Sequence, residues 1–142
     1  MEIKDLKYLV AYSVPLFTII GLYFQSYWVF LAPVFAFVIV PFFEIILPLQ
    51  NKNLSEEKKE SKNKSWFFDA LLFLNIPLVF GIIAWYLWSV YASNYATFEL
   101  IGITFSVGLA LGSNGINVAH ELGHHPIKFQ KALGKILLIP AL

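Results

Sequence analysis

Long apolar stretches constrain the fold of this 142-residue chain more than any other feature. Hydrophobic residues make up 58% of the sequence and charged residues only 13%, which is not the composition of a soluble domain. A helix needs about 20 mostly apolar residues to cross a bilayer. Apolar stretches of about this length occupy residues 8–24, 28–49, 66–90 and 98–119. The sequence therefore predicts an all-α integral membrane protein with four transmembrane helices.

The positions of the lysines predict how these helices are oriented. The 10 basic residues are all lysines, and they fall in residues 1–7, in the polar loop at residues 50–65, or after residue 126. The turns that follow the first and third helices contain none. Cytoplasmic segments of membrane proteins carry the excess of Lys and Arg. We therefore expect a multi-pass protein of the cytoplasmic (inner) membrane, with both ends of this chain and the end of the fourth helix on the cytoplasmic side.

The tail at residues 126–142 combines apolar and basic side chains. Pro126 favours the start of a new element. The basic side chains occupy a face of their own, separate from the apolar ones, and they are Lys128, Lys131 and Lys135. This pattern predicts a short amphipathic helix that lies at the inner membrane surface.

All three histidines lie in a short segment, residues 120–125, at the end of the fourth predicted helix. If this segment is helical, His120 and His124 are one turn apart and share a face. Two imidazoles so placed can bind one metal ion or serve two metals of a cluster. A single histidine near a helix end is more often a partner of the helix dipole. Three of them, with Glu121 between, favour a metal site that includes His120, His124 and His125.

Further polar residues are expected close to the histidines. On a helical wheel, one stripe of the fourth helix carries Glu99, Ser106, Ser113, Asn117, His120 and His124. Gly108 and Gly112 lie on the opposite side, in a spacing that favours close helix packing. Two carboxylates, Glu44 and Asp69, lie near the predicted cytoplasmic ends of their helices. A charged side chain there is costly unless it has a function or reaches the membrane–water interface. We expect Glu44, Asn117 and Glu121 to support the ligating imidazoles by hydrogen bonding.

The pattern His120-Glu121-x-x-His124 also occurs in zinc proteases, in which the glutamate is the general base. The residues around this pattern distinguish a zinc protease from an iron oxygenase. The run from Ser113 to His124 resembles the first histidine box of the membrane alkane 1-monooxygenases, relatives of the membrane fatty acid desaturases and hydroxylases. The segments 41–44, 75–78 and 132–135 are also similar. The resemblance covers nearly the whole chain, although only the box is specific.

This resemblance implies a non-haem di-iron centre that uses O₂ to hydroxylate a terminal methyl group, with electrons from a rubredoxin or ferredoxin. His120 and His124 would be iron ligands; the family usually has Lys at the position of His125, so no ligand role is implied there. The expected partners are the lipid bilayer and an alkane or fatty-acyl substrate, and no nucleic acid is expected.

The family's later histidine boxes are absent from these 142 residues. We therefore expect the chain to be an amino-terminal fragment of a larger histidine-box bundle that binds metal weakly and is inactive alone. A fatty acid desaturase or hydroxylase of the same superfamily, an intramembrane zinc metalloprotease and a non-catalytic membrane protein remain alternatives.

Overall fold

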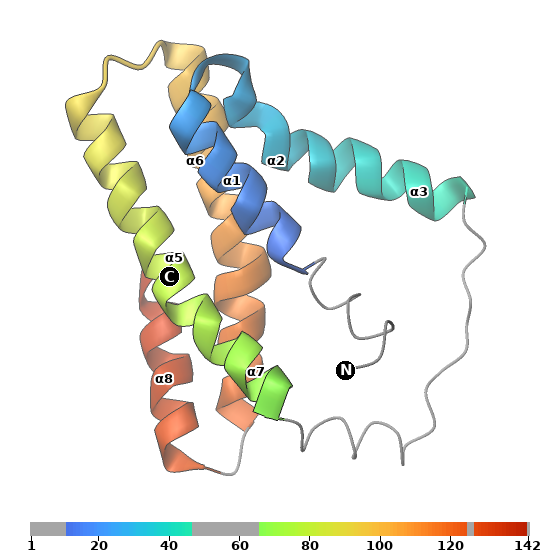
Figure 1. Cartoon of the computed structure of the whole chain (residues 1–142), viewed down its shortest axis with the longest axis vertical. Helices are drawn as coiled ribbons and strands as arrows, with labels where there is room; N and C mark the ends of the chain where they lie inside the picture. The colour runs from blue at the N-terminus through green and yellow to red at the C-terminus, as the bar shows by residue number, and fades with distance from the viewer. Residues whose placement is uncertain (1–10, 47–65, 125–126, 142) are drawn as a thin grey trace.

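The computed structural model describes residues 11–46, 66–124 and 127–141, and the regular structure in these ranges is entirely helical (Figure 1). The predicted loop at residues 50–65 lies outside them, and at residues 66–69 only the backbone is described. The elements are α1 (Ser13–Phe24), the 3₁₀-helix η2 (Ser26–Phe30), α2 (Leu31–Val34), the π-helical turn η3 (Phe35–Ile39), α3 (Val40–Ile46), α5 (Trp66–Ala92), α6 (Thr97–Ala110), the π-helical turn η4 (Leu111–Ile116), α7 (Asn117–His124), α8 (Lys128–Leu138) and the 3₁₀-helix η5 (Ile139–Ala141).

Three helical segments in the described ranges are long and apolar enough to cross a membrane. They are Ser26–Ile46, Ala70–Ala92 and Thr97–His124, of 21, 23 and 28 residues. The expected fourth span, at residues 8–24, is represented by α1, which has only 12 residues in the described part of the chain. At 1.5 Å per residue, α1 is about 18 Å long, against about 30 Å for the hydrocarbon core. The described helices therefore give three candidate spans, and the expected fourth is not confirmed.

The helices form a bundle from which one arm diverges (Figure 1). α1, α5 and α6 pack against one another, and η4 and α7 continue the direction of α6. The segment from α2 to α3 leads away from the bundle, whereas α8 folds back along α7. The turn after α1 and the turn between α5 and α6 lie at the same end, and α7 lies at the opposite end.

The end of the bundle near the two turns is held by an apolar cluster from α1, η2, α5 and α6. Its buried members are Leu22, Val29, Ile82, Ile103, Val107 and Ala110. Two glycines allow the close approach of the backbones. A Cβ on Gly102 would lie 2.5 Å from Val29 Cγ2, and a Cβ on Gly21 would lie 3.0 Å from the carbonyl oxygen of Trp28. The turn after α1 is thereby pressed onto α6.

At the other end, α8 packs closely on α7. Val79, Ala119 and Leu137 form a second buried cluster that joins α5, α7 and α8. A Cβ on Gly134 would lie 2.8 Å from the carbonyl oxygen of Ala119, so only glycine fits there without a shift of the backbone. The tail helix thus packs its buried face on protein; its position at a membrane surface stays a prediction.

The close helix packing expected from the glycine spacing in the fourth span is not found in the described structure. A Cβ on Gly108 or on Gly112 would meet no atom within 4 Å, so neither residue marks a close helix contact among the described elements. The close contacts are made instead by Gly21, Gly102 and Gly134, each of which lies against residues of another helical element. A spacing of four along one helix does not reveal which face a partner covers.

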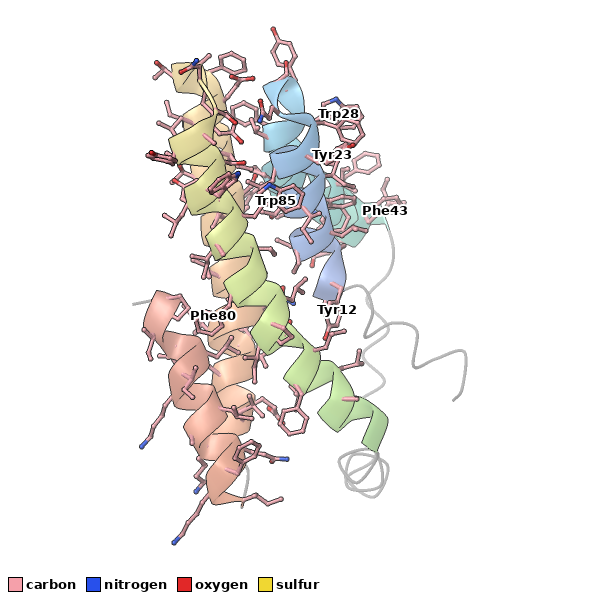
Figure 2. All side chains as sticks on the ribbon, turned by 60° about the vertical axis from the view of Figure 1, so that its left-hand side comes forward. Tyr12, Tyr23, Trp28, Phe43, Phe80 and Trp85 are labelled. Atoms are coloured by element: carbon pink, nitrogen blue, oxygen red, sulfur yellow. The ribbon has the colours of Figure 1, made fainter. Side chains whose placement is uncertain are left out.

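Many large apolar side chains remain exposed, as expected for helices that contact lipid. Figure 2 shows Tyr23 and Trp28 near the turn after α1, with Phe43 on α3. Their exposed fractions are 68%, 53% and 52%. Trp and Tyr side chains are enriched where a membrane meets water. Among the three candidate spans, Thr97–His124 is the most enclosed, with 39% of its apolar window buried against 17% for each of the other two.

Candidate metal centre

His120 and His124 lie one turn apart on α7 and share one face, as expected from the sequence. Their Nε2 atoms are 3.2 Å apart, and the two rings meet edge to face with centroids 4.6 Å apart. At this distance one ring nitrogen donates a hydrogen bond to the other, and the tautomers decide which one donates. Both side chains are exposed. The pair therefore presents two converging nitrogens on an open side of the helix.

The geometry of the pair fits two ligands of one metal ion. A divalent ion bound about 2.1 Å from each nitrogen would have an N–metal–N angle of about 100° at the observed separation of 3.2 Å. That angle lies between the ideal octahedral and tetrahedral values, so little rearrangement is needed. Within the described residues, however, no group of three or more His, Cys, Asp or Glu side chains could hold a metal ion. Two nitrogens are an incomplete shell for iron or zinc, and a metal bound here would need further ligands from outside the described residues.

The other predicted site residues are not gathered around this pair. Glu121 and Asn117 lie on α7 beside the histidines, and both are exposed. Glu44 is exposed on α3, in the arm that diverges from the bundle, whereas α7 lies at the lower end of the bundle in Figure 1. His125 lies outside the described residues, as does the side chain of Asp69. Supporting roles for Glu121, Asn117 and Glu44, and a ligand role for His125, stay predictions.

The single polar stripe expected along the fourth span is broken in the structure. Ser106 is fully buried, and its hydroxyl donates a hydrogen bond of 2.5 Å to the carbonyl oxygen of Val29. Ser113 and the two histidines are exposed. The π-helical turn η4 lies between Ser106 and the histidines; it takes up more residues per turn than an α-helix and changes the register between α6 and α7. A wheel drawn for a regular helix misses this change.

Sequence reasoning also missed a buried polar chain that joins α1, α5 and η4. The amide nitrogen of Asn114 donates to Asn75 Oδ1 at 2.8 Å, and the amide nitrogen of Asn75 donates to the Tyr12 hydroxyl at 2.8 Å. Tyr12 in turn donates to the carbonyl oxygen of Leu71 at 2.5 Å. The available signal was an amide side chain inside each of two apolar stretches, because such groups in a membrane usually bond across helices.

Comparison with known proteins finds relatives that match most of the chain. An alkane 1-monooxygenase of Pseudomonas putida is 26% identical over 100 residues, which cover 70% of this chain. The chain is similar to the alkane 1-monooxygenases. Alkane 1-monooxygenase 1 of Alcanivorax borkumensis is 26% identical over 129 residues, or 87% of the chain. Alkane 1-monooxygenase 2 of Pseudomonas aeruginosa is 24% identical over 121 residues, or 84% of the chain.

These relatives are much longer than the region they share with this chain. The matched residues span 25% of the Pseudomonas putida protein and 32% of each of the other two. No family model matches the chain. The resemblance inferred from the histidine box is thus confirmed by three relatives at low identity, each of which matches most of the chain.

Proposed function

We propose that this chain supplies one histidine pair to the non-haem iron centre of a membrane alkane hydroxylase. The observation that carries the proposal is the separation of 3.2 Å between the Nε2 atoms of His120 and His124 on an exposed helical face. The similarity to alkane 1-monooxygenases supports iron over zinc as the metal. The described residues offer only this pair, so the complete centre, with two irons, would need ligands from outside them.

The length of the span that carries the histidines supports a position for the pair at the membrane surface. Thr97–His124 has 28 residues and is about 42 Å long, which exceeds the hydrocarbon core by about 12 Å. If Thr97 lies at one face of the core, the excess corresponds to about eight residues, the length of α7. The histidines would then project beyond the hydrocarbon. The lysines support a cytoplasmic position for that end, in the inner membrane.

In the proposed reaction, bound iron would supply the activation of O₂, with electrons from a rubredoxin or ferredoxin. The chain's own residues have two tasks. His120 and His124 would hold the metal through Nε2, and Nδ1 of each ring would then be available to donate a hydrogen bond. The apolar spans hold a substrate such as an alkane near the centre, because an alkane partitions into hydrocarbon rather than water. The terminal methyl group is the proposed position of hydroxylation.

Titration of the purified chain with Co²⁺ in detergent tests the ligand pair. We expect one ion to bind weakly, with an absorption band typical of nitrogen ligands. His120→Ala and His124→Ala should each abolish that band, because a single imidazole loses the chelate geometry. His125→Ala is the matched control: it also removes one imidazole, and it should have a milder effect.

Three results would contradict the proposal or favour an alternative. If His120→Ala leaves Co²⁺ binding at the level of the unchanged chain, the pair is not the metal site. Zn²⁺ that binds more tightly than Co²⁺ and supports hydrolysis of a peptide dependent on Glu121 would favour the zinc-protease alternative. Desaturation of a fatty-acyl substrate by a protein that contains the full centre, without oxidation of octane, would favour the desaturase alternative.

A further inference from the structure

The π-helical turn η4 lies directly before the helix that carries the histidines. α6 ends at Ala110, η4 spans Leu111–Ile116, and α7 begins at Asn117. A π turn closes hydrogen bonds between residues i and i+5, so it accommodates about one residue more than an α turn. Such turns are uncommon and occur frequently at functional sites. Because η4 directly precedes α7, its geometry sets the direction in which the side chains of α7 point.

The extra residue resets the register between α6 and α7. On an uninterrupted wheel of 100° per residue, Ala119 and Leu122 would lie about 120° from the face formed by Ile103, Val107 and Ala110. All five are nevertheless buried. When one residue is absorbed in η4, the difference falls to about 20°. The π turn thus brings the buried face of α7 into line with that of α6, and His120 and His124 point to the opposite side.

Asn114, in the middle of η4, is the polar residue that connects this turn to the bundle. It is 2% exposed, and Asn75, its partner on α5, is 3% exposed. The hydrogen bonds run in one direction. Ser113 Oγ donates to Asn114 Oδ1 at 2.9 Å, Asn114 donates to Asn75 at 2.8 Å, and Asn75 donates to Tyr12 at 2.8 Å and to the Leu71 carbonyl oxygen at 2.9 Å. Both amides thus have partners for the donor and the acceptor groups.

An amide buried among apolar helices is costly unless its donors and acceptors are bonded. In the observed register, the side chain of Asn114 meets Asn75. A register shift would remove that contact and leave two buried amides without each other. The pair therefore favours the one arrangement of η4 in which the amides meet.

We propose that Asn114 and Asn75 are positioning residues for the histidine pair. By holding the π turn, they set the direction in which His120 and His124 face, about 100° away from the direction that a regular helix would give. This inference rests on the proposed metal-binding function for its meaning, but it is tested by a measurement that needs no metal.

The test is disulfide crosslinking in the full chain, which contains no cysteine of its own. Val79 on α5 lies in one buried cluster with Ala119, so Val79→Cys with Ala119→Cys should crosslink on oxidation. Val79→Cys with Val118→Cys is the companion pair, because Val118 would take the place of Ala119 if α7 turned by one residue. The ratio of the two crosslinking yields shows which side of α7 lies against α5.

The informative variant is the double change Asn75→Leu with Asn114→Leu. Leucine has a similar size, and replacing both partners by apolar groups avoids an unsatisfied amide, so the protein should still fold. We expect the ratio to fall roughly threefold, as for the loss of one interhelical hydrogen bond of average strength, because the Asn114–Asn75 bond is the one that links η4 to α5. Tyr86→Phe is the matched control, since it removes the 2.8 Å bond to Thr104 that also joins α5 to α6, and it should leave the ratio unchanged.

A second change should reverse the effect. Deletion of Gly112 from the double-leucine variant removes one residue from the turn, so a regular helix would then give the original facing. A Cβ on Gly112 would meet no atom within 4 Å, so this residue makes no close contact that its removal would break. We expect the deletion to restore the crosslinking ratio.

Two outcomes would overturn the inference. One is an unchanged ratio in the double-leucine variant; the other is a fall that deletion of Gly112 does not reverse, because that indicates general loosening. Co²⁺ titration of the same proteins separates this inference from the proposed function. If no variant binds Co²⁺ but the ratio changes as expected, the metal proposal fails and the positioning of α7 by the amide pair stands.

Discussion

The backbone amide of Ser26 donates a hydrogen bond to the carboxylate of Glu99, 2.7 Å away and 73 residues further along the chain. The other carboxylate oxygen of Glu99 accepts from the backbone amide of Ala96 at 2.8 Å, at the start of α6. One side chain thus caps α6 and fastens the turn after α1 to it. Gln25 and Ser93, which are 3.3 Å apart between Nε2 and Oγ, add a second link between the same two turns.

The role of Glu99 leads to a stability prediction. Glu99→Ala removes both acceptors, and we expect the free energy of unfolding to fall by about 1–2 kcal/mol, because hydrogen bonds to a charged group contribute more than neutral ones. Glu99→Gln keeps one acceptor oxygen and should lose about half as much. Circular dichroism during denaturation by SDS measures the difference. Equal stability of the Ala and Gln variants would contradict the bridging role.

The arrangement of the two turns at one end predicts the labelling pattern of the protein in intact cells. Asn94 lies exposed in the turn between α5 and α6, and Ala132 is exposed on α8. Asn94→Cys should react with a membrane-impermeant thiol reagent from outside, and Ala132→Cys should react only after the membrane is permeabilised. The reverse pattern would overturn the cytoplasmic assignment of the histidines.

The contact of α8 with α7 predicts a contrast between two glycines. Gly134→Ala should lower stability by about 1–3 kcal/mol, because the added methyl group meets a backbone oxygen and forces the helices apart. Gly108→Ala should be neutral or stabilising by up to about 1 kcal/mol, since there is open space and Ala favours the helix. SDS denaturation of the two variants decides the matter. A loss at Gly108 as large as that at Gly134 would restore the packing role first inferred from the glycine spacing.

The number of ligands predicts that these 142 residues alone do not oxidise alkanes. The purified chain, loaded anaerobically with Fe²⁺ and supplied with octane, O₂ and a reduced rubredoxin system, should form no 1-octanol above a control without metal. Two imidazoles form an open, exchangeable site, which cannot hold a second metal close by. Two tightly held irons per chain, or measurable 1-octanol, would show that this region is an enzyme by itself.

In a protein that contains the complete centre, the two histidines should behave alike and Glu121 should not. His120→Ala or His124→Ala should abolish both bound iron and hydroxylation. Glu121→Gln keeps a hydrogen-bonding side chain and should reduce activity only in part, because its expected role is support of the ligands. Complete loss of activity with a normal metal content in Glu121→Gln would indicate that the carboxylate takes part in proton transfer.

The sequence by itself determined the helical class, three of the four expected apolar spans and the shared face of His120 and His124. Each of these depends on residues that are near one another in the chain, so length, composition and a spacing of four are sufficient. The histidine box also carried the similarity to the alkane 1-monooxygenases. The resemblance rests on local residues and needs no knowledge of how the helices pack.

Only the tertiary structure decided which residues of different helices meet and how α7 is turned relative to α6. The contact of Asn75 with Asn114 joins residues 39 positions apart, and no periodicity along either helix predicts it. The close approach at Gly134 depends on the return of α8 along α7, so the glycine spacing in α6 and η4 gave the wrong packing face. The π turn changed the register of a helix that appears regular in sequence, because its extra residue is stabilised by partners on other helices. Burial and partner contacts across the bundle, rather than local propensity, fix these features.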